Sequence, residues 1–290
     1  RSTLFPYTTL FRSERWSVPL LGAQGGVMIT ASHNPPSYNG LKVRTDDGGP
    51  ATATVTQQIE TAVQRLGSDH RVADREDGSL HKGHMTGAPI EPFDPLPRYR
   101  DRLRTLIDME RIARSRLHVV IDPMYGASQG MMAALLREIG LEVDEIHGEV
   151  NPWFGGRSPE PSPEHLFELV ERVQGLGPSR RMGLALDGDG DRLAAIAEDG
   201  SYVTPHQIFA LLLRHLVNRR GLSGTVVKTF STTTMIDRLA APYGLRVIVT
   251  PIGFKHIAEV MRREEVLIGG EESGGRSEEH TSELQSRTLI

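Results

Sequence analysis

The chain has 290 residues, of which 38% are hydrophobic and 24% are charged, and this composition is ordinary for a soluble globular protein of about two domains. The formal net charge of -4 offers no basic excess for a nucleic-acid partner, and the absence of cysteine excludes disulfides, zinc thiolates and cysteine nucleophiles. No apolar run approaches the roughly 20 residues that cross a bilayer. We therefore expect a cytoplasmic protein that binds neither nucleic acid nor membrane.

Both ends of the sequence read as foreign to the rest. Residues 276–286, RSEEHTSELQS, and residues 3–13, TLFPYTTLFRS, resemble in-frame translations of a common pair of short-read sequencing adapters. We expect segments 1–13 and 276–290 to be artefacts, so that the genuine protein runs from about residue 14 to residue 275. The alternative is a polar C-terminal tail and an unusual N-terminus.

A first unit is expected over residues 14–97. Short apolar runs predict strands at 26–30 and 41–43, with a polar loop around Ser32 between them, where Pro35 and Pro36 prevent a helix. Apolar residues at helical spacing predict a helix over 55–66. The polar stretch that follows, 67–97, is expected to be a linker or a long loop.

A second unit is expected over residues 98–201. Its helices are predicted at 103–112, at 126–139 and in a stretch ending near Val173, and its strands at 118–122, 141–146, 182–186 and 193–197. This alternation favours a mostly parallel sheet with right-handed crossovers. The proline-rich residues 158–163 are expected to form a stiff surface segment.

A third unit is expected over residues 202–275, with the same alternation of strands and helices. Helices are predicted at 208–217, 235–241 and 255–262, and strands at 225–228, 245–250 and 266–268. The whole chain is thus predicted to be α/β, built from tandem domains with mixed or parallel sheets.

The most informative motif is acidic and follows the strand at 182–186. Asp187, Asp189 and Asp191 alternate with glycines, which let the backbone fold so that the three carboxylates converge. Oxygen ligands of this kind suit Mg²⁺. A calcium loop is the competing interpretation, but Arg192 occupies the sixth position, where such a loop needs glycine.

Two further segments offer polar groups for chemistry. Ser32 follows a strand and has His33 and Lys42 nearby, which suggests a serine that carries a phosphoryl group beside the metal. His33 either acts as an acid, base or phosphate donor, or only shapes the turn. Glu271 and Ser273 lie on a glycine-rich turn and are able to bind paired sugar hydroxyls, although such turns are common.

Taken together, the three motifs resemble those of the α-D-phosphohexomutases. GVMITASHNPPSYNGLKV at 26–43 is similar to the active-serine segment of that family, DGDGDR at 187–192 to its metal loop, and GEESGG at 270–275 to its sugar-recognition loop. Their order and spacing agree with the family over about residues 18–275. The resemblance implies tandem α/β domains of the phosphohexomutase type, incomplete at both ends.

The resemblance also implies a role for each matching residue. Ser32 would be the phosphoserine, and Mg²⁺ would be held by Asp187, Asp189 and Asp191 together with the Ser32 phosphate. Arg192 would help to hold the phosphoserine or the substrate. Lys42 matches a lysine implicated in acid/base chemistry, and His33 would line the same pocket. The residues expected to bind the sugar are Glu271, Ser273 and Lys255.

The activity implied is that of an isomerase, which moves a phosphoryl group between O1 and O6 of a hexose phosphate through a hexose 1,6-bisphosphate. Glucose phosphates are the first expectation, with phosphomannomutase or dual specificity as the alternative. A calcium- or carbohydrate-binding module is the non-enzymatic alternative. Family members have four domains, so a chain without the start of the first and without the fourth is expected to be poorly active.

Overall fold

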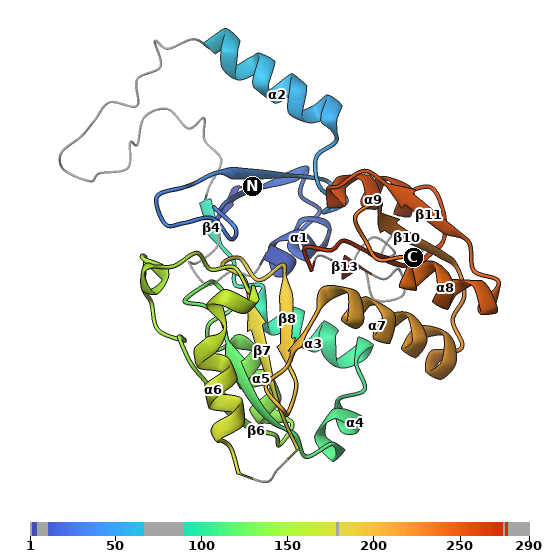
Figure 1. Cartoon of the computed structure of the whole chain (residues 1–290). Coiled ribbons are helices and arrows are strands. Elements are labelled where there is room, and N and C mark those ends of the chain that lie inside the picture. The colour runs from blue at the N-terminus through green and yellow to red at the C-terminus, as the bar shows by residue number, and fades with distance from the viewer. Residues whose placement is uncertain (1, 5–10, 67–89, 178–179, 275, 278–290) are drawn as a thin grey trace, which may run out of the picture.

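The computed structural model describes residues 2–4, 11–66, 90–177, 180–274 and 276–277. Figure 1 shows two α/β units, one in green to yellow and one in orange to red, with a blue hairpin lying over both. The strand order of the larger sheet is β6-β5-β7-β8-β9, and that of the smaller is β11-β10-β12-β13. The predicted α/β class with mixed and parallel sheets is confirmed.

The first unit is built around an antiparallel hairpin. Strands β2 (Gly25–Ile29) and β3 (Leu41–Thr45) pair so that Met28 lies opposite Lys42. This register places Lys42 next to the loop that carries Ser32. The other elements of this part are α1 (Phe11–Leu20), α2 (Ala53–Leu66), β1 (Ser2–Leu4) and β4 (Ile90–Pro92), of which the last two pair in parallel.

The stretch 67–97 was expected to be a linker or long loop. Its residues 67–89 lie outside the described part of the chain. The remainder is not all loop, because β4 occupies Ile90–Pro92 and α3 (Leu96–Leu106) begins at Leu96.

The second unit contains the larger sheet. Strands β5 (His118–Asp122), β6 (Glu142–Glu145) and β7 (Arg181–Leu186) are parallel, whereas β8 (Leu193–Ile196) and β9 (Tyr202–Val203) continue the sheet in antiparallel pairing. The third unit was predicted to start at residue 202, but β9 completes the second sheet. The carboxyl ends of β5 and β7 meet at one edge, and the acidic motif follows β7 there.

Two predicted helices of this unit differ from the structure. The helix expected over 103–112 is two helices, α3 and α4 (Met109–Arg114), because the backbone is extended at Ile107 and the Asp108 side chain caps α4 by accepting from the Arg111 N–H. The helix expected from 126 begins only at Met131, as α5 (Met131–Glu138). Residues 124–130 form turns, and Gly130, with a φ of 70°, directly precedes the helix.

The proline-rich segment 158–163 was predicted to lie on the surface, and this is wrong. Pro159 and Pro161 are buried, and the backbone oxygen of Pro159 accepts a hydrogen bond from the N–H of Gly188. The segment therefore packs against the acidic loop. It is preceded by the 3₁₀ turn η1 (Phe154–Gly156) and followed by η2 (Pro163–His165) and α6 (Phe167–Gly175).

The third unit follows the predicted alternation of strands and helices. Its elements in chain order are α7 (Pro205–Arg220), β10 (Thr225–Thr229), α8 (Met235–Ala240), η3 (Ala241–Tyr243), β11 (Val247–Thr250), α9 (Phe254–Met261), β12 (Val266–Gly270) and β13 (Arg276–Ser277). Strands β10, β11 and β12 are parallel.

Each large sheet has a core on both faces, because neighbouring strand residues point to opposite sides. In the second unit Val120 packs with α6, whereas Val119 and Ile121 pack with α5. In the third unit Val226 packs with α7 and α8, whereas Val227 packs with α9. Both units are therefore three-layered, and their sheets have polar loops at the strand ends.

Candidate active site

The Ser32 loop and the acidic loop meet although 155 residues separate Ser32 from Asp187 in sequence. The Ser32 hydroxyl lies 3.4 Å from a carboxylate oxygen of Asp187 and 3.5 Å from one of Asp189. Ser32 itself has a φ of 54°, which is uncommon for a residue other than glycine. The sequence-predicted pairing of a serine with the acidic motif is thus present in the structure.

Thr30 holds this unusual backbone in place. Its hydroxyl oxygen accepts a hydrogen bond from the Ser32 N–H at 2.8 Å and donates to Asp189 at 3.0 Å. The strained residue is therefore tied directly to one of the carboxylates. Sequence analysis did not single out Thr30, although it is part of the TASHNP motif.

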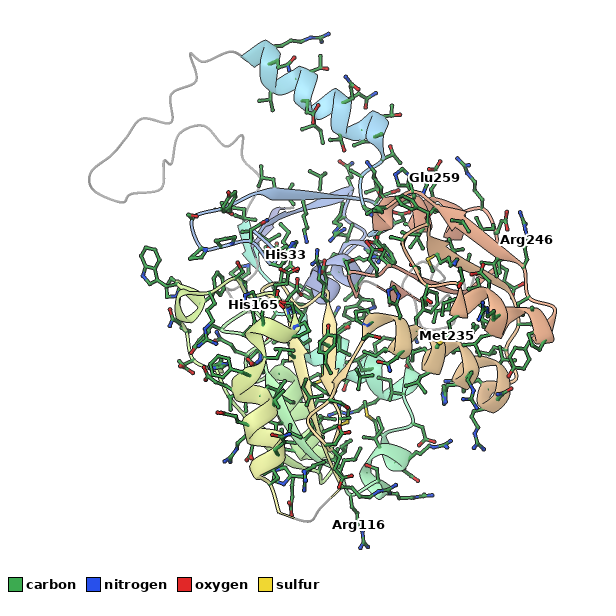
Figure 2. All side chains as sticks on the ribbon, viewed as in Figure 1. His33, Arg116, His165, Met235, Arg246 and Glu259 are labelled. Atoms are coloured by element: carbon green, nitrogen blue, oxygen red, sulfur yellow. The ribbon has the colours of Figure 1, made fainter. Side chains whose placement is uncertain are left out.

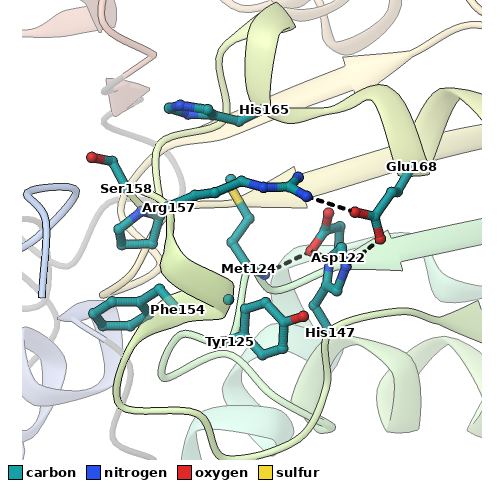
Figure 3. A pocket seen from close by; sticks show the side chains of 11 residues that line it. Asp122, Met124, Tyr125, His147, Phe154, Arg157, Ser158, His165 and Glu168 are labelled. Carbon is teal, nitrogen blue, oxygen red and sulfur yellow. Dashed lines mark hydrogen bonds and ion pairs between the residues drawn. The ribbon is translucent and has the colours of Figure 1, made fainter.

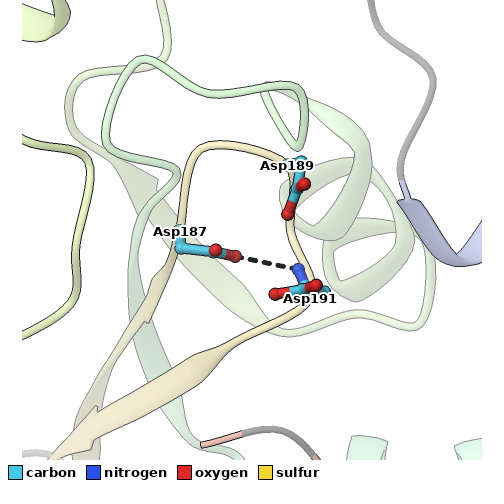
Figure 4. A group of neighbouring side chains, drawn as sticks. All are labelled: Asp187, Asp189 and Asp191. Atoms are coloured by element: carbon cyan, nitrogen blue, oxygen red, sulfur yellow. Dashed lines mark hydrogen bonds between the residues drawn. The ribbon is translucent and has the colours of Figure 1, made fainter. Parts of the chain in front are cut away.

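The acidic loop brings its three carboxylates together around a tight turn (Figure 4). One oxygen from each of Asp187, Asp189 and Asp191 lies within 4.8 Å of the others. The Asp187 oxygen that does not contact Ser32 accepts from the backbone N–H groups of Asp191 and Arg192, at 2.8 and 2.9 Å. Gly190 makes the turn possible with a φ of 75°.

These residues fit a hard divalent cation. Asp187 and Asp189 are 0% and 2% exposed, so two carboxylates are shielded from water and lie beside a third, that of Asp191. Burial and the charges of Asp191 and Asp189 raise the pKa of Asp187 well above its usual range. A bound cation would offset that electrostatic cost, and an all-oxygen donor set is what Mg²⁺ prefers.

Lys42 joins the hairpin to the same cluster. Its ammonium group lies 2.7 Å from Asp189 and 3.3 Å from Asp191, and it donates to the Ser32 hydroxyl at 3.4 Å. The β2–β3 register accounts for this position, since it sets Lys42 beside the start of the Ser32 loop. A positive charge therefore lies next to the hydroxyl.

His33 and Arg192 lie at the rim of the cluster. Figure 2 shows His33 where the hairpin meets the loops of the second unit. The His33 Nδ1 atom is buried and has no hydrogen-bond partner, and burial together with the Arg192 charge lowers the pKa of its imidazole. Arg192 forms an ion pair of 3.4 Å with Glu160, a residue that sequence analysis did not select.

The described part of the glycine-rich loop, residues 270–274, reaches the same site. A Cβ atom added to Gly274 would lie 3.7 Å from the Cβ of Arg192, so this loop packs against the end of the acidic motif. Glu271 is buried, and one of its oxygens accepts from the Ser273 hydroxyl at 3.1 Å while the other has no partner. Burial raises the pKa of Glu271.

The neighbouring Glu272 side chain is bound at the end of β10. Its carboxylate accepts from the hydroxyls of Thr229 and Ser231, at 2.9 and 2.5 Å, at the end of β10. Of the two neighbouring glutamates, Glu271 is the one with a buried oxygen that has no partner among the described residues. Lys255 is exposed in the first turn of α9, and within the described residues no hydrogen bond or ion pair links its side chain to the carboxylates.

Family models match most of the chain. Models of phosphoglucomutase/phosphomannomutase α/β/α domains I, II and III match residues 14–70, 97–200 and 204–282. The chain belongs to the phosphoglucomutase/phosphomannomutase family, the α-D-phosphohexomutases. The phosphomutases of this family are isomerases that act as intramolecular phosphotransferases. The first matched residue coincides with the expected start at 14, and the last match extends past 275.

Individual phosphohexomutases are similar over most of the chain. The phosphoglucomutase/phosphomannomutase of Thermococcus kodakarensis is 33% identical over 90% of the chain and 54% of its own length. The phosphoglucosamine mutase of Methanococcus vannielii is 30% identical over 86% of the chain and 53% of its own length. The chain thus spans about half the length of the curated relatives it matches.

Solved structures agree with this membership. The crystal structure of a "putative phosphomannomutase" from Thermus thermophilus matches 95% of the chain and 60% of its own, with a TM-score of 0.83 and 30% identity. A phosphoglucomutase from Paramecium, parafusin, shares the fold with a TM-score of 0.74 at 21% identity. In the described parts of the phosphohexomutase chain, every helix is too short or too polar to cross a bilayer.

Proposed function

We propose that the whole protein is a phosphohexomutase in which Ser32 carries the transferred phosphoryl group. The observation that supports this most directly is the convergence of the Ser32 hydroxyl, the Lys42 ammonium and the Asp187–Asp191 carboxylates within hydrogen-bonding distance. A hydroxyl that lies beside buried carboxylates and the Lys42 ammonium suits phosphoryl transfer, because charge develops on the phosphoryl group as it is transferred.

The proposed reaction has two matched halves. First the bond between phosphorus and the Ser32 oxygen breaks while a bond forms to a free hydroxyl of a hexose monophosphate. The proton of that hydroxyl passes through Lys42 to the Ser32 oxygen, which lies 3.4 Å from the ammonium nitrogen. The resulting hexose 1,6-bisphosphate then reorients in the site, and its other phosphoryl group is transferred to Ser32 by the same steps in reverse.

Asp187, Asp189 and Asp191 would hold Mg²⁺, together with the phosphate on Ser32. A bound Mg²⁺ supplies positive charge next to the transferring group. Arg192 and His33 line the rim of this site and would hold the phosphate or the substrate. Arg192 is positioned for this by its ion pair with Glu160.

Glu271 and Ser273 would bind sugar hydroxyls, with Lys255 as a further contact. The buried Glu271 oxygen without a hydrogen-bond partner would accept from a sugar hydroxyl, and the charges of Arg192 and Asp191 act on this carboxyl group. Glucose phosphates are the proposed substrates, because the loop reads GEESGG. Mannose phosphates are the alternative, and similarity to phosphoglucosamine mutases adds glucosamine phosphates.

Intact-mass analysis tests the proposal on the chain itself. After incubation with glucose 1,6-bisphosphate and Mg²⁺, the wild-type chain should gain one phosphoryl group and the Ser32→Ala chain none. Equal labelling of both chains, or labelling of neither, would contradict the proposal and favour a binding module without catalysis. A coupled assay of the full-length protein on glucose, mannose and glucosamine 1-phosphates then ranks the substrates.

A further inference from the structure

A chain of charged side chains lies beside the acidic loop, in residues to which the proposed function assigns no role. They line a small pocket between the end of β5, the end of β6 and the start of α6 (Figure 3). Asp122 is buried at the end of β5, and Glu168 is in the first turn of α6. His147 lies between them, after β6.

The imidazole of His147 bridges two carboxylates. Its Nδ1 lies 3.0 Å from Asp122 and its Nε2 lies 2.8 Å from Glu168. The chain continues from Glu168 to Arg157, whose guanidinium donates at 2.9 Å. Alternating charges, two negative and two positive, therefore link the end of β5, the loop after β6, the first turn of α6 and the residue before the proline-rich segment.

One end of this chain fixes the loop that follows β5. Asp122 accepts from the Met124 N–H at 2.8 Å, and the Tyr125 N–H donates to the backbone oxygen of His147 at 3.0 Å. The rings of Tyr125 and His147 also contact each other, with centroids 4.7 Å apart. These contacts hold residues 123–127, although Met124, Tyr125 and His147 all have positive φ angles.

The other end fixes the proline-rich segment. Arg157 is bonded to Glu168 and lies 4.6 Å from the Phe167 ring centroid, in a cation–π contact. Arg157 directly precedes Ser158 and Pro159, so its position sets where that segment runs.

Both held segments bind the backbone of the same residue of the acidic loop, Gly188. The Ala127 N–H donates to the Gly188 oxygen at 2.8 Å, and the Gly188 N–H donates to the Pro159 oxygen at 3.1 Å. A Cβ atom at Gly188 would lie only 2.3 Å from the Ser32 backbone oxygen. The position of Gly188 therefore determines how closely Asp187 and Asp189 approach Ser32.

We propose that Asp122, His147, Glu168 and Arg157 form a positioning network that holds Gly188 against the Ser32 loop only while His147 carries a proton on both ring nitrogens. The network touches neither the serine nor the three aspartates, so its members are positioning residues. The catalytic consequence of this inference rests on the proposed function, whereas the linkage to Gly188 does not.

The charges around His147 favour the imidazolium form. A neutral imidazole donates from one nitrogen only, so one of the two carboxylates would then face a lone pair. The hydrogen bond to Asp122 raises the pKa of His147 to about 9, against an opposing contribution from burial and with a further contribution from Glu168. The other ionisable groups of the pocket are Arg157, Tyr125 and His165, and Glu149 acts on Tyr125.

The sign of the pH dependence follows from this raised pKa. A group whose pKa is raised in the folded state contributes stability below its unfolded pKa, and that contribution is lost as pH rises through the folded value. The network should therefore hold Gly188 at neutral pH and release it as pH rises through about 9.

Nuclear magnetic resonance on the full 290-residue chain tests this linkage. The non-exchanging imidazole protons of His147 and the ¹³Cα signal of Gly188 are followed in one alkaline titration. In the wild type the two signals should move with the same midpoint, near 9. In Glu168→Gln both midpoints should fall together by about one pH unit, because the imidazolium loses one of its two carboxylate partners.

The matched control is Glu142→Gln, which removes the carboxylate that lies 3.3 Å from His118 at the opposite end of β5 and β6. It should leave the midpoints of His147 and Gly188 unchanged. A Gly188 signal that ignores the His147 titration in the wild type would overturn the inference, and this comparison needs no variant to fold.

Mg²⁺ titration separates this inference from the proposed function. The wild type should bind Mg²⁺ several-fold more weakly at about pH 9.5 than at about pH 8, and Glu168→Gln should lose affinity at lower pH than the wild type. Absence of Mg²⁺ binding at about pH 8 would count against the proposed function alone. Mg²⁺ binding with no common midpoint for His147 and Gly188 would count against the positioning network alone.

Discussion

An ion pair joins the hairpin that carries Ser32 to the third unit. Arg262, at the end of α9, donates to Asp47 at 2.9 Å and to the backbone oxygen of Pro50 at 3.3 Å. Asp47 lies in the turn that follows β3, and its carboxylate also accepts from the Gly49 N–H at 2.8 Å. The pair joins residues 215 positions apart in sequence.

The strength of this ion pair follows from the ionisation of Asp47. Burial opposes ionisation, but hydrogen bonds from Arg262, Thr45 and Gly49 outweigh it and lower the pKa of Asp47 from 3.8 to about 2. At about 1.4 kcal/mol per pH unit, the difference corresponds to roughly 2.5 kcal/mol. Thr45 and Gly49, in the same turn, supply part of this shift, and both paired side chains are partly exposed, 19% for Asp47 and 26% for Arg262. The expected contribution of the ion pair is therefore only about 1–2 kcal/mol.

We predict that Asp47→Asn and Arg262→Gln each lower the free energy of unfolding by about 1–2 kcal/mol at pH 7, and that the double variant costs little more than either. The lowered pKa means that this stability is present above about pH 4 and is lost as pH falls toward 2. The difference between wild type and Asp47→Asn should therefore shrink over that window. Urea unfolding at a series of pH values measures it.

The neighbouring pair Arg263–Glu259 is the matched control. It is a helical i,i+4 ion pair at 2.6 Å with both side chains more than half exposed, so Arg263→Gln should cost only a few tenths of a kcal/mol. Additive effects of Asp47→Asn and Arg262→Gln, or a difference from wild type that does not change with pH, would refute the role of the Asp47–Arg262 ion pair.

Three further outcomes are expected. Gly188→Ala should abolish phosphorylation of Ser32 by glucose 1,6-bisphosphate, because its Cβ would lie 2.3 Å from the Ser32 oxygen, whereas Gly177→Ala, with open space around it, should be phosphorylated normally. Thr30→Val should slow that phosphorylation and Thr30→Ser should restore it, since only the hydroxyl bonds Ser32 and Asp189; equal rates would argue against the role. Leu213→Ala, in the third-unit core, should lower the free energy of unfolding by about 2–5 kcal/mol, and a loss below about 1 kcal/mol would contradict the packing described.

Much of the fold could be predicted because local patterns determine it. The uninterrupted apolar run Val119, Val120 and Ile121 marks a strand covered on both faces, and all three residues are buried. The Thr204–Gln207 capping box starts α7 at Pro205, three residues before the predicted start at 208. The site was predictable for the same reason, since the acidic motif and the Ser32 loop each follow a strand. The prediction that the two loops meet in space rests on the resemblance to the family, because no spacing rule brings together residues 155 positions apart.

The features that the sequence did not predict depend on tertiary contacts. Residues 126–130 were assigned to a helix because they precede an apolar helical pattern, but contacts to His147 and Gly188 hold residues 125–127 in a loop. Pro159 was placed on the surface because prolines usually lie there, yet its oxygen satisfies the Gly188 N–H. The bridging role of His147 had no local signal, since its partners lie on other elements.

The central claim is that one divalent cation joins the phosphate on Ser32 to the three aspartates. Phosphorus-31 NMR of the chain phosphorylated at Ser32 tests it most directly when Mn²⁺ replaces Mg²⁺. We predict that one equivalent of Mn²⁺ broadens the phosphoserine signal beyond detection in the wild type and leaves it sharp in Asp189→Asn. A phosphoserine signal that stays sharp in the wild type while Mn²⁺ is bound would contradict the claim.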